Sequence, residues 1–130
     1  MSAVVLDSHV VHWWSAEPDR VSPAAAKAIE GADELLVADI SWFELAWLAR
    51  HERIVVSVPI LSWLSQLAVQ LRTIPVTPAI AAAAVELPSS FPGDPADRLI
   101  YATAVETGAR LVTKDRNLRG HKAPHPVALW

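Results

Sequence analysis

The residues best suited to chemistry are four acids that lie far apart in the sequence: Asp7, Glu44, Asp97 and Asp115. If they meet in space, their carboxylates repel one another unless a cation lies between them. A cluster of oxygen ligands without thiolates suits hard divalent ions such as Mg²⁺ or Mn²⁺. A bound ion of this kind lowers the pKa of water and stabilises negative charge on a phosphoryl oxygen, so the four acids are a candidate metal site.

Each acid also has a purely structural interpretation. Residues 41–44 match a capping box, in which Glu44 reaches back to the start of its helix. In residues 94–97, Asp94 can cap a helix that begins at Pro95, and Asp97 is an acid favoured by the helix dipole. Asp115 can belong to a turn, and Asp7 can cap the first helix. The metal site is therefore predicted from the four acids together rather than from any one of them.

Short apolar segments alternate with segments of helical periodicity. We expect strands at 3–6, 35–38, 74–76, 110–113 and 127–130, and helices at 8–15, 23–31, 41–53, 59–71, 78–87 and 95–108. Buried strands separated by helices are typical of a mostly parallel sheet covered on both faces, which is an α/β fold. Ligands of such sheets bind at the carboxyl ends of the strands, where all four acids are expected to lie.

The tryptophans and the helix at 41–53 give specific packing expectations. Ile40, Phe43, Trp47 and Leu48 are spaced to form one apolar face of that helix. Trp42 and Trp47 are about 140° apart around it, so one is expected in the core and the other facing a partner. Three tryptophans outside this helix are expected in the core: Trp13, Trp14 and Trp63.

Composition limits the possible classes of protein. The chain has 130 residues, of which 52% are hydrophobic and 19% charged, which predicts one globular domain over 1–130. The absence of cysteine excludes disulfides, zinc–thiolate sites and a cysteine nucleophile. No secretory signal is visible and no apolar stretch approaches the roughly 20 residues of a membrane span. We therefore expect a cytoplasmic protein without a membrane partner.

Several charged residues near the acids have two interpretations. His9 and His12 follow Asp7 and are expected to be structural, with substrate contact or proton transfer as the alternative. Arg98 either pairs with an acid or holds a phosphate. The net charge of −3 argues against a general polycation, but a basic segment surrounds Asp115 and either holds a nucleic-acid backbone or is an ordinary solvated surface. Its candidate RNA-binding residues are Lys114, Arg116, Arg119 and Lys122.

Four segments in order resemble PIN-domain proteins, most closely the VapC-type toxins of bacterial type II toxin–antitoxin modules. Residues 5–9 (VLDSH) followed by two tryptophans resemble the family's opening. Residues 40–46 (ISWFELA) resemble the segment that carries its glutamate, and residues 94–104 (DPADRLIYATA) the segment of its third acid. Residues 111–115 (LVTKD) are similar to its final strand and acid. The resemblance covers nearly the whole chain.

The resemblance implies a PIN-like three-layer α/β/α sandwich and an endoribonuclease that depends on Mg²⁺ or Mn²⁺. It assigns catalysis to the four acids, with Asp7 and Asp97 holding the metal, which would activate water for attack on an RNA phosphodiester. Thr113 would support an acid or a water molecule, and Asp94 is more a helix cap than a ligand. The implied partners are RNA, a VapB-type antitoxin and a second copy of the chain.

Three positions depart from the family's pattern, and none removes an acid. Ser8 stands where threonine is more common, and Ala96 stands where an aromatic residue is usual. Residues 90–93 (SFPG) lack the histidine often found there. The last two differences bear on the loop beside the site and so on substrate choice. Two alternatives to the toxin remain: a PIN-type nuclease of RNA processing, and a non-catalytic RNA-binding module.

Overall fold

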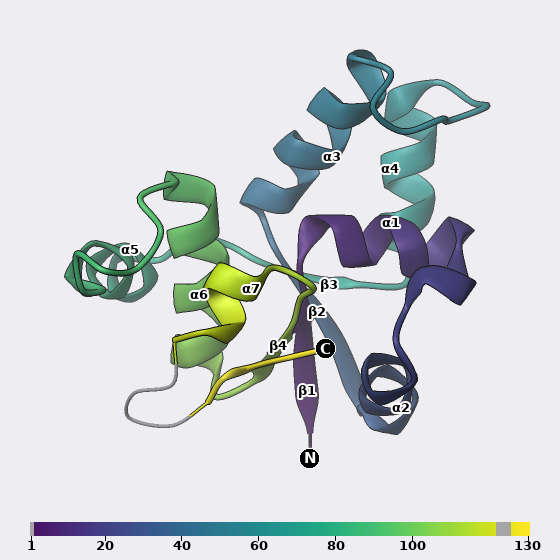
Figure 1. Cartoon of the computed structure of the whole chain (residues 1–130). Helices are drawn as coiled ribbons and strands as arrows, with labels where there is room; N and C mark the ends of the chain where they lie inside the picture. Colours follow the sequence, from purple (N-terminus) through teal and green to yellow (C-terminus); the bar gives the residue numbers. More distant parts are fainter. Residues whose placement is uncertain (1, 122–125) are drawn as a thin grey trace.

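Five strands form one parallel sheet in the order β3-β2-β1-β4-β5 in the computed structural model, which describes residues 2–121 and 126–130 (Figure 1). The prediction of an α/β fold is therefore confirmed. The third strand ends at Ile74 rather than 76, because the next residue, Pro75, has no N–H to donate to a neighbouring strand. The strands are β1 (Ala3–Leu6), β2 (Glu34–Ala38), β3 (Arg72–Ile74), β4 (Arg110–Val112) and β5 (Ala128–Leu129).

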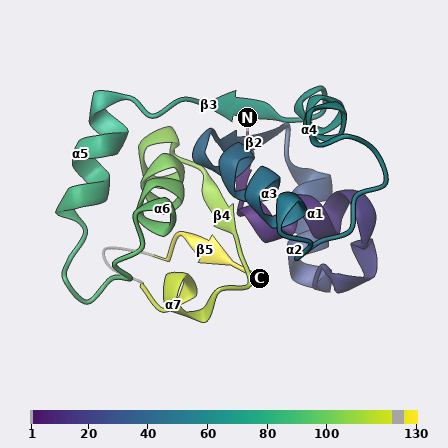
Figure 2. The same cartoon turned by 90° about the horizontal axis from the view of Figure 1, so that it is seen from above.

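Helices cover both faces of the sheet, and the three-layer arrangement is visible from above (Figure 2). One layer contains α1 (Ser8–Ala16), the 3₁₀ helix η1 (Pro18–Arg20), α2 (Pro23–Gly31), α3 (Ile40–Arg50) and α4 (Ile60–Ala68). The other contains α5 (Pro78–Glu86), α6 (Pro95–Thr107) and α7 (Arg116–Arg119). Within residues 2–121 and 126–130, none of these helices is long and apolar enough to cross a membrane.

The alternation of side chains along β1 joins the two helical layers to the sheet. Val4 and Leu6 are buried in the core cluster that includes α1, α2 and α4. Val5, which points to the opposite face, is buried with Ile100 and Tyr101 of α6. A strand covered on both faces has no polar side chain to place, which is why β1 is a continuous apolar run that ends at Asp7.

Several helix ends follow the signals in the sequence. Ser22 caps α2, because its Oγ accepts a hydrogen bond from the backbone N–H of Ala25 at 3.1 Å. Asp94 caps α6 through its Oδ1, which accepts from the N–H groups of Ala96 and Asp97 at 2.8 and 3.2 Å. Gly108 ends α6 with φ of 69°, a left-handed conformation that glycine adopts without steric cost.

The apolar face predicted for α3 is wrong. Phe43 and Trp47 are 65% and 43% exposed, whereas Leu45 and Ser41 are buried. Helix α3 also ends at Arg50, three residues before the predicted end. Periodicity identifies apolar residues that share a face but does not say which face meets the core, and α3 turns Leu45 inward. Trp42 is the tryptophan of this helix that packs on the core, with Trp13, Trp14 and Trp63.

The strand order places a crevice beside β1. From β1 the chain moves outward through β2 and β3 on one side, and later returns to β4 and β5 on the other. Ligands of open parallel sheets bind at this point of reversal, outside the carboxyl ends of the strands. Asp7 follows β1 and Asp115 follows β4 at the same edge of the sheet.

Candidate active site

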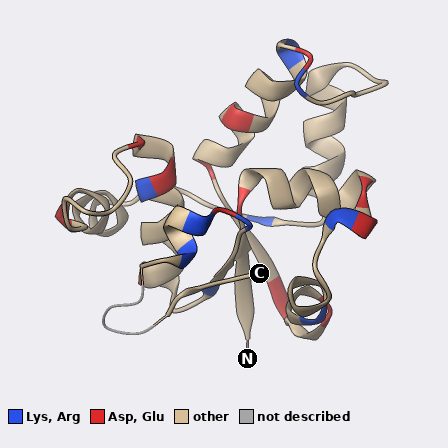
Figure 3. Cartoon of the chain, in the orientation of Figure 1, with Lys and Arg blue, Asp and Glu red and all other residues tan. Residues whose placement is uncertain are grey.

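The four predicted acids line one pocket of about 400 Å³ at the carboxyl edge of the sheet, which we call the acid pocket. Figure 3 shows acidic positions on α3 and α6 and at the ends of the central strands where these helices approach the sheet. The elements that contribute them are therefore β1, α3, α6 and the turn after β4. The complete lining is Asp7, His9, Val10, Glu44, Asp97, Lys114 and Asp115.

Asp7 is held by hydrogen bonds to both of its carboxylate oxygens. Oδ1 accepts from the backbone N–H of Ser8 at 2.8 Å, and Oδ2 accepts from the Thr113 hydroxyl at 2.7 Å. The oxygen of Thr113 in turn accepts from the backbone N–H of Asp115 at 3.1 Å. Burial raises the pKa of Asp7, although the hydrogen bonds from Thr113 and Ser8 oppose that shift. Asp7 thus caps α1, as its structural interpretation predicted, and also lines the pocket.

Glu44 is held by a pair of serines. The Ser8 hydroxyl donates to Glu44 Oε1 at 2.6 Å, and the Ser8 and Ser41 hydroxyl oxygens lie 2.9 Å apart. Because Ser8 has one hydroxyl hydrogen and a carboxylate only accepts, Ser41 supplies the hydrogen of the serine–serine bond. The capping-box interpretation is wrong, since Asp39 occupies the cap position of α3 and Ser41 is buried inside the helix. Partial burial and the charge of Asp7 raise the pKa of Glu44.

Asp97 lies among four other carboxylates, which oppose its negative charge. Burial and the nearby charges of Asp94, Asp7, Asp115 and Glu44 raise its pKa to about 7. In the part of the chain that the structure describes, no donor hydrogen-bonds its carboxylate. Asp115 caps α7, because its Oδ1 accepts from the N–H of Asn117 at 2.8 Å, and it also lines the pocket. Asp94 lies outside the pocket lining and caps α6.

The donor set suits a hydrated divalent cation better than a closed protein cage. Among residues 2–121 and 126–130, no three His, Asp or Glu side chains are close enough to hold one ion together. Mg²⁺ keeps several waters and usually takes one or two carboxylates directly. Asp97, whose charge is opposed by four neighbouring carboxylates and which accepts no hydrogen bond from residues 2–121 and 126–130, is a position where a cation would relieve repulsion.

Comparison with known proteins identifies the family of this chain. The PIN domain family matches residues 4–123, a range that runs from the second residue of β1 to beyond α7 and includes all four acids of the pocket. The chain belongs to the PIN-domain family. Over all 130 residues it is 68% identical to Ribonuclease VapC22 of Mycobacterium tuberculosis, and the match covers 100% of both chains. Within the PIN-domain family it is therefore a VapC-type protein.

Solved structures share the PIN-domain architecture at low sequence identity. A toxin–antitoxin complex from Klebsiella pneumoniae gives a TM-score of 0.70 at 17% identity, covering 98% of this chain and 96% of the other. VapBC2 from Rickettsia felis, bound to a DNA fragment from its promoter, gives a TM-score of 0.72 at 14% identity, covering 98% of this chain and 97% of the other. At these identities the likeness shows the fold alone.

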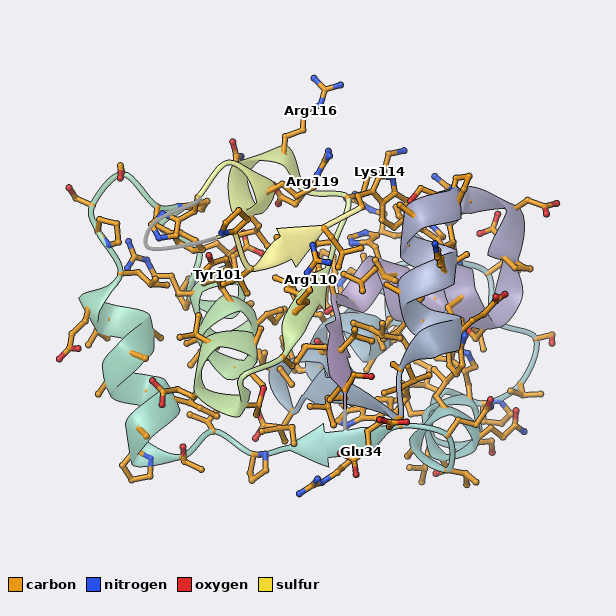
Figure 4. All side chains as sticks on the ribbon, turned by 90° about the horizontal axis from the view of Figure 1, so that it is seen from below. Glu34, Tyr101, Arg110, Lys114, Arg116 and Arg119 are labelled. Atoms are coloured by element: carbon orange, nitrogen blue, oxygen red, sulfur yellow. The ribbon has the colours of Figure 1, made fainter. Side chains whose placement is uncertain are left out.

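The candidate RNA-binding residues of this PIN domain differ in how far their charged groups are free to contact a ligand. Lys114 lines the acid pocket, and its Nζ lies 5.7 Å from the centroid of the Trp13 ring. Figure 4 shows Arg116 pointing away from the ribbon. Arg119 is half-buried, and its guanidinium donates to the backbone carbonyl of Lys114 at 3.1 Å. Lys122 lies outside the described residues.

Arg98 has neither of its two predicted roles. Its guanidinium donates hydrogen bonds to one backbone carbonyl of α5 and to four between α5 and α6, which places the loop before Asp97. The acceptors are Pro92, Ala84, Leu87, Pro88 and Phe91, at 2.9 to 3.3 Å. Sequence spacing suggested an acid or a phosphate because Arg98 follows Asp97, but on a helix adjacent residues point in different directions.

The two histidines and the two serines complete the site. His12 is buried and its Nε2 lies 3.1 Å from Glu17 Oε2, which agrees with a structural role, whereas His9 lines the acid pocket. Sequence reasoning missed the positioning roles of Ser8 and Ser41. The position of Ser8 directly after Asp7 could have indicated its role. A hydroxyl residue in the first turn of α1 lies beside Asp7, the acid that caps this helix.

Proposed function

We propose that this protein is a Mg²⁺- or Mn²⁺-dependent endoribonuclease that hydrolyses RNA phosphodiester bonds. The observation that carries the proposal is the convergence of Asp7, Glu44, Asp97 and Asp115 on one pocket at the reversal point of the sheet. The name of the 68% identical relative, Ribonuclease VapC22, supports RNA as the substrate class. Family membership supports a divalent metal.

The side chains divide the work in this proposal. Asp7 and Asp97 hold the cation, and Glu44 and Asp115 orient water through their free carboxylate oxygens. When bound, the divalent ion lowers the pKa of water and offsets negative charge on the phosphoryl group. Thr113 and Ser8 keep the carboxylates of Asp7 and Glu44 in fixed orientations. Lys114, at the rim of the acid pocket, offers a positive charge to the RNA backbone.

We further propose that the protein is the toxin of a type II toxin–antitoxin module in the cytoplasm. The partners in this proposal are a VapB-type antitoxin and a second copy of the chain. Support comes from the VapC-type relative and from structural neighbours whose titles name toxin–antitoxin and VapBC complexes. Growth arrest on expression, relieved by a small protein encoded beside the gene, is the expected observation. Arrest that persists when Asp7→Asn is expressed contradicts a nuclease toxin.

The central experiment is RNA cleavage with Mg²⁺ or Mn²⁺, with and without a chelator, by the wild type and Asp7→Asn. We expect the chelator to abolish cleavage because it removes the divalent ion. We expect the same of the substitution, because Asn keeps the shape of Asp7 and removes its charge. Glu86→Gln, an exposed change on α5, is the matched control and should cleave normally. Cleavage that survives both treatments overturns the metal mechanism. RNA that is bound but uncut, together with no Mn²⁺ binding in calorimetry, would favour a non-catalytic module.

A further inference from the structure

A second pocket adjoins the acid pocket and has the opposite electrostatic character. It has a volume of about 680 Å³ and lies between α1, η1 and the segment after α3. His9 lines both pockets, so they meet at the first turn of α1. We call it the basic pocket, because Arg20 and Arg53 line it against a single acid, Glu17.

Trp13 connects the cations of the two pockets. The Arg20 guanidinium carbon lies 4.6 Å from the centroid of the Trp13 ring, and Lys114 Nζ lies 5.7 Å from the same centroid. Trp13 itself is only 8% exposed, so its ring is a fixed support for both side chains. Cations over an indole face are attracted by its negative face, which holds Arg20 and Lys114 in place without neutralising their charge.

The acid in the basic pocket neutralises little of this charge. The Glu17 carboxylate lies 3.1 Å from His12 Nε2 and 3.9 Å from Arg20, and the pair with Arg20 is exposed on both sides. Arg53 comes from the loop after α3 and makes no ion pair within residues 2–121 and 126–130. The basic pocket therefore presents positive charge directly beside a pocket whose carboxylates repel phosphate.

We propose that Arg20 and Arg53 form a subsite for an RNA phosphate next to the one that is cut. This inference rests on the proposed ribonuclease function and extends it to how the strand is held. The acid pocket attracts a phosphate only at its cation, so affinity for the strand must come from positive charges nearby. Arginine suits this position because its planar guanidinium binds phosphate oxygens in pairs. The strand then runs from the acid pocket past Lys114 and Trp13 to Arg20 and Arg53.

The test separates binding from cutting. In the Asp7→Asn background, at fixed Mg²⁺, we would measure the affinity of a labelled single-stranded RNA of mixed sequence over a range of salt concentrations. Each phosphate that is no longer neutralised lowers the salt slope by about 0.7, so Arg20→Gln with Arg53→Gln, which removes one phosphate subsite, should lower the slope by about 0.7. Replacement of both residues by lysine should keep the slope, since charge is retained. Arg72→Gln is the control, because Arg72 is exposed on β3, away from both pockets.

Cleavage by the otherwise wild-type protein distinguishes the two proposals. If Arg20→Gln with Arg53→Gln raises KM and leaves kcat nearly unchanged, the subsite is supported. If the wild type cuts RNA and the double variant binds it with unchanged affinity and slope, the subsite is overturned while the nuclease stands. If RNA binding and cleavage are unchanged and the double variant instead no longer binds an acidic protein partner, the basic pocket is a protein-binding surface and the subsite is overturned. Absence of cleavage by the wild type overturns the nuclease itself.

Discussion

On the α1–α3 side of the acid pocket, Asp7 and Glu44 each accept a hydrogen bond from a hydroxyl of another element. On the α6 side, the Asp97 carboxylate accepts none from the part of the chain that the structure describes. A donor aimed at a carboxylate favours its charged form and fixes its orientation. The first side is therefore organised before any ligand binds, whereas the charge of Asp97 is left to be balanced by a proton or a cation.

The α6 side obtains its order from backbone contacts instead. Asp94 caps the helix, and Arg98 binds the carbonyls of the preceding loop. These contacts place the backbone of Asp97 without touching its carboxylate. The comparison teaches that the same pocket combines two means of positioning an acid, one through the side chain and one through the helix that carries it. Each means can be removed separately.

The largest effect is expected from Arg98→Met. Hydrogen bonds to a charged group contribute about 1.5–3 kcal/mol each and are not additive, so we expect the free energy of unfolding to fall by about 3 kcal/mol. The loop before α6 loses its common partner, and cleavage should fall with the displacement of Asp97. Urea unfolding measures the first effect and an RNA cleavage assay the second. Arg50→Met, an exposed change at the end of α3, is the control. Equal stability of the two variants would contradict the role of Arg98.

The next effect tests the α1–α3 side through Thr113→Val. Loss of the hydroxyl that orients Asp7 should lower kcat/KM and Mn²⁺ affinity by about 10–100-fold, the usual effect of removing a partner of a metal ligand. The pKa of Asp7 should rise further, which shifts the onset of activity to higher pH. Thr113→Ser keeps the hydroxyl and should restore most of the activity. A valine variant that loses stability but keeps its Mn²⁺ affinity and pH profile would show that Thr113 only supports the fold.

The sequence predicts the parts of this pocket that depend on local patterns. The cap at Asp94 follows from an acid before a proline, and the four acids follow from their places at strand and helix ends. The hydroxyl partners join residues far apart, such as Thr113 and Asp7, which are separated by 106 positions. Local patterns do not specify such a pair, and only the family resemblance indicated that Thr113 supports an acid or a water molecule. Its geometry depends on the parallel register that sets Leu6 beside Val112.

The incorrect predictions have a common physical origin. Phe43 and Trp47 form an apolar face, but periodicity is the same for a face that meets the core and one that is exposed. The position of Arg98 directly after Asp97 suggested an acid or a phosphate as its partner, whereas its acceptors are backbone carbonyls of α5 and of the loop that follows α5. Arg20 and Arg53, which come from different segments, show no shared motif and meet only in the folded chain.

A smaller effect is expected from Ser8→Ala. Glu44 loses its hydroxyl donor, and the buried Ser41 loses its partner, so we expect activity to fall by up to about tenfold and stability by about 1 kcal/mol. The effect is smaller than that of Thr113→Val because Glu44 is less buried than Asp7 and water can replace part of the bond. Ser65→Ala, an exposed change on α4, is the control. A loss as large as that of Asp7→Asn would mean that Ser8 itself contacts the reacting groups.

The smallest effect concerns the pH dependence of stability in protein treated with a chelator. The pKa of Asp97 is about 7 in the folded protein and about 3.9 in an unfolded chain. At pH values between these two pKa values, Asp97 is protonated in the folded protein and ionised in the unfolded chain. Protonation of Asp97 therefore contributes fully to stability below about pH 4, and this contribution is lost as the pH rises through 7. We expect the melting temperature to be a few degrees lower at pH 8 than at pH 5, and this difference should be smaller in Asp97→Asn.

Divalent cations should reverse this loss where Asp97 is ionised. We expect Mn²⁺ to raise the melting temperature of the wild type more at pH 8 than at pH 5, because a cation that binds only the folded state stabilises it. Asp97→Asn should show a much smaller response at both pH values. If the wild type and Asp97→Asn have the same pH dependence and the same response to Mn²⁺, then the charge of Asp97 is balanced within the chain. The two sides of the acid pocket would then not differ in the way that their hydrogen bonds indicate.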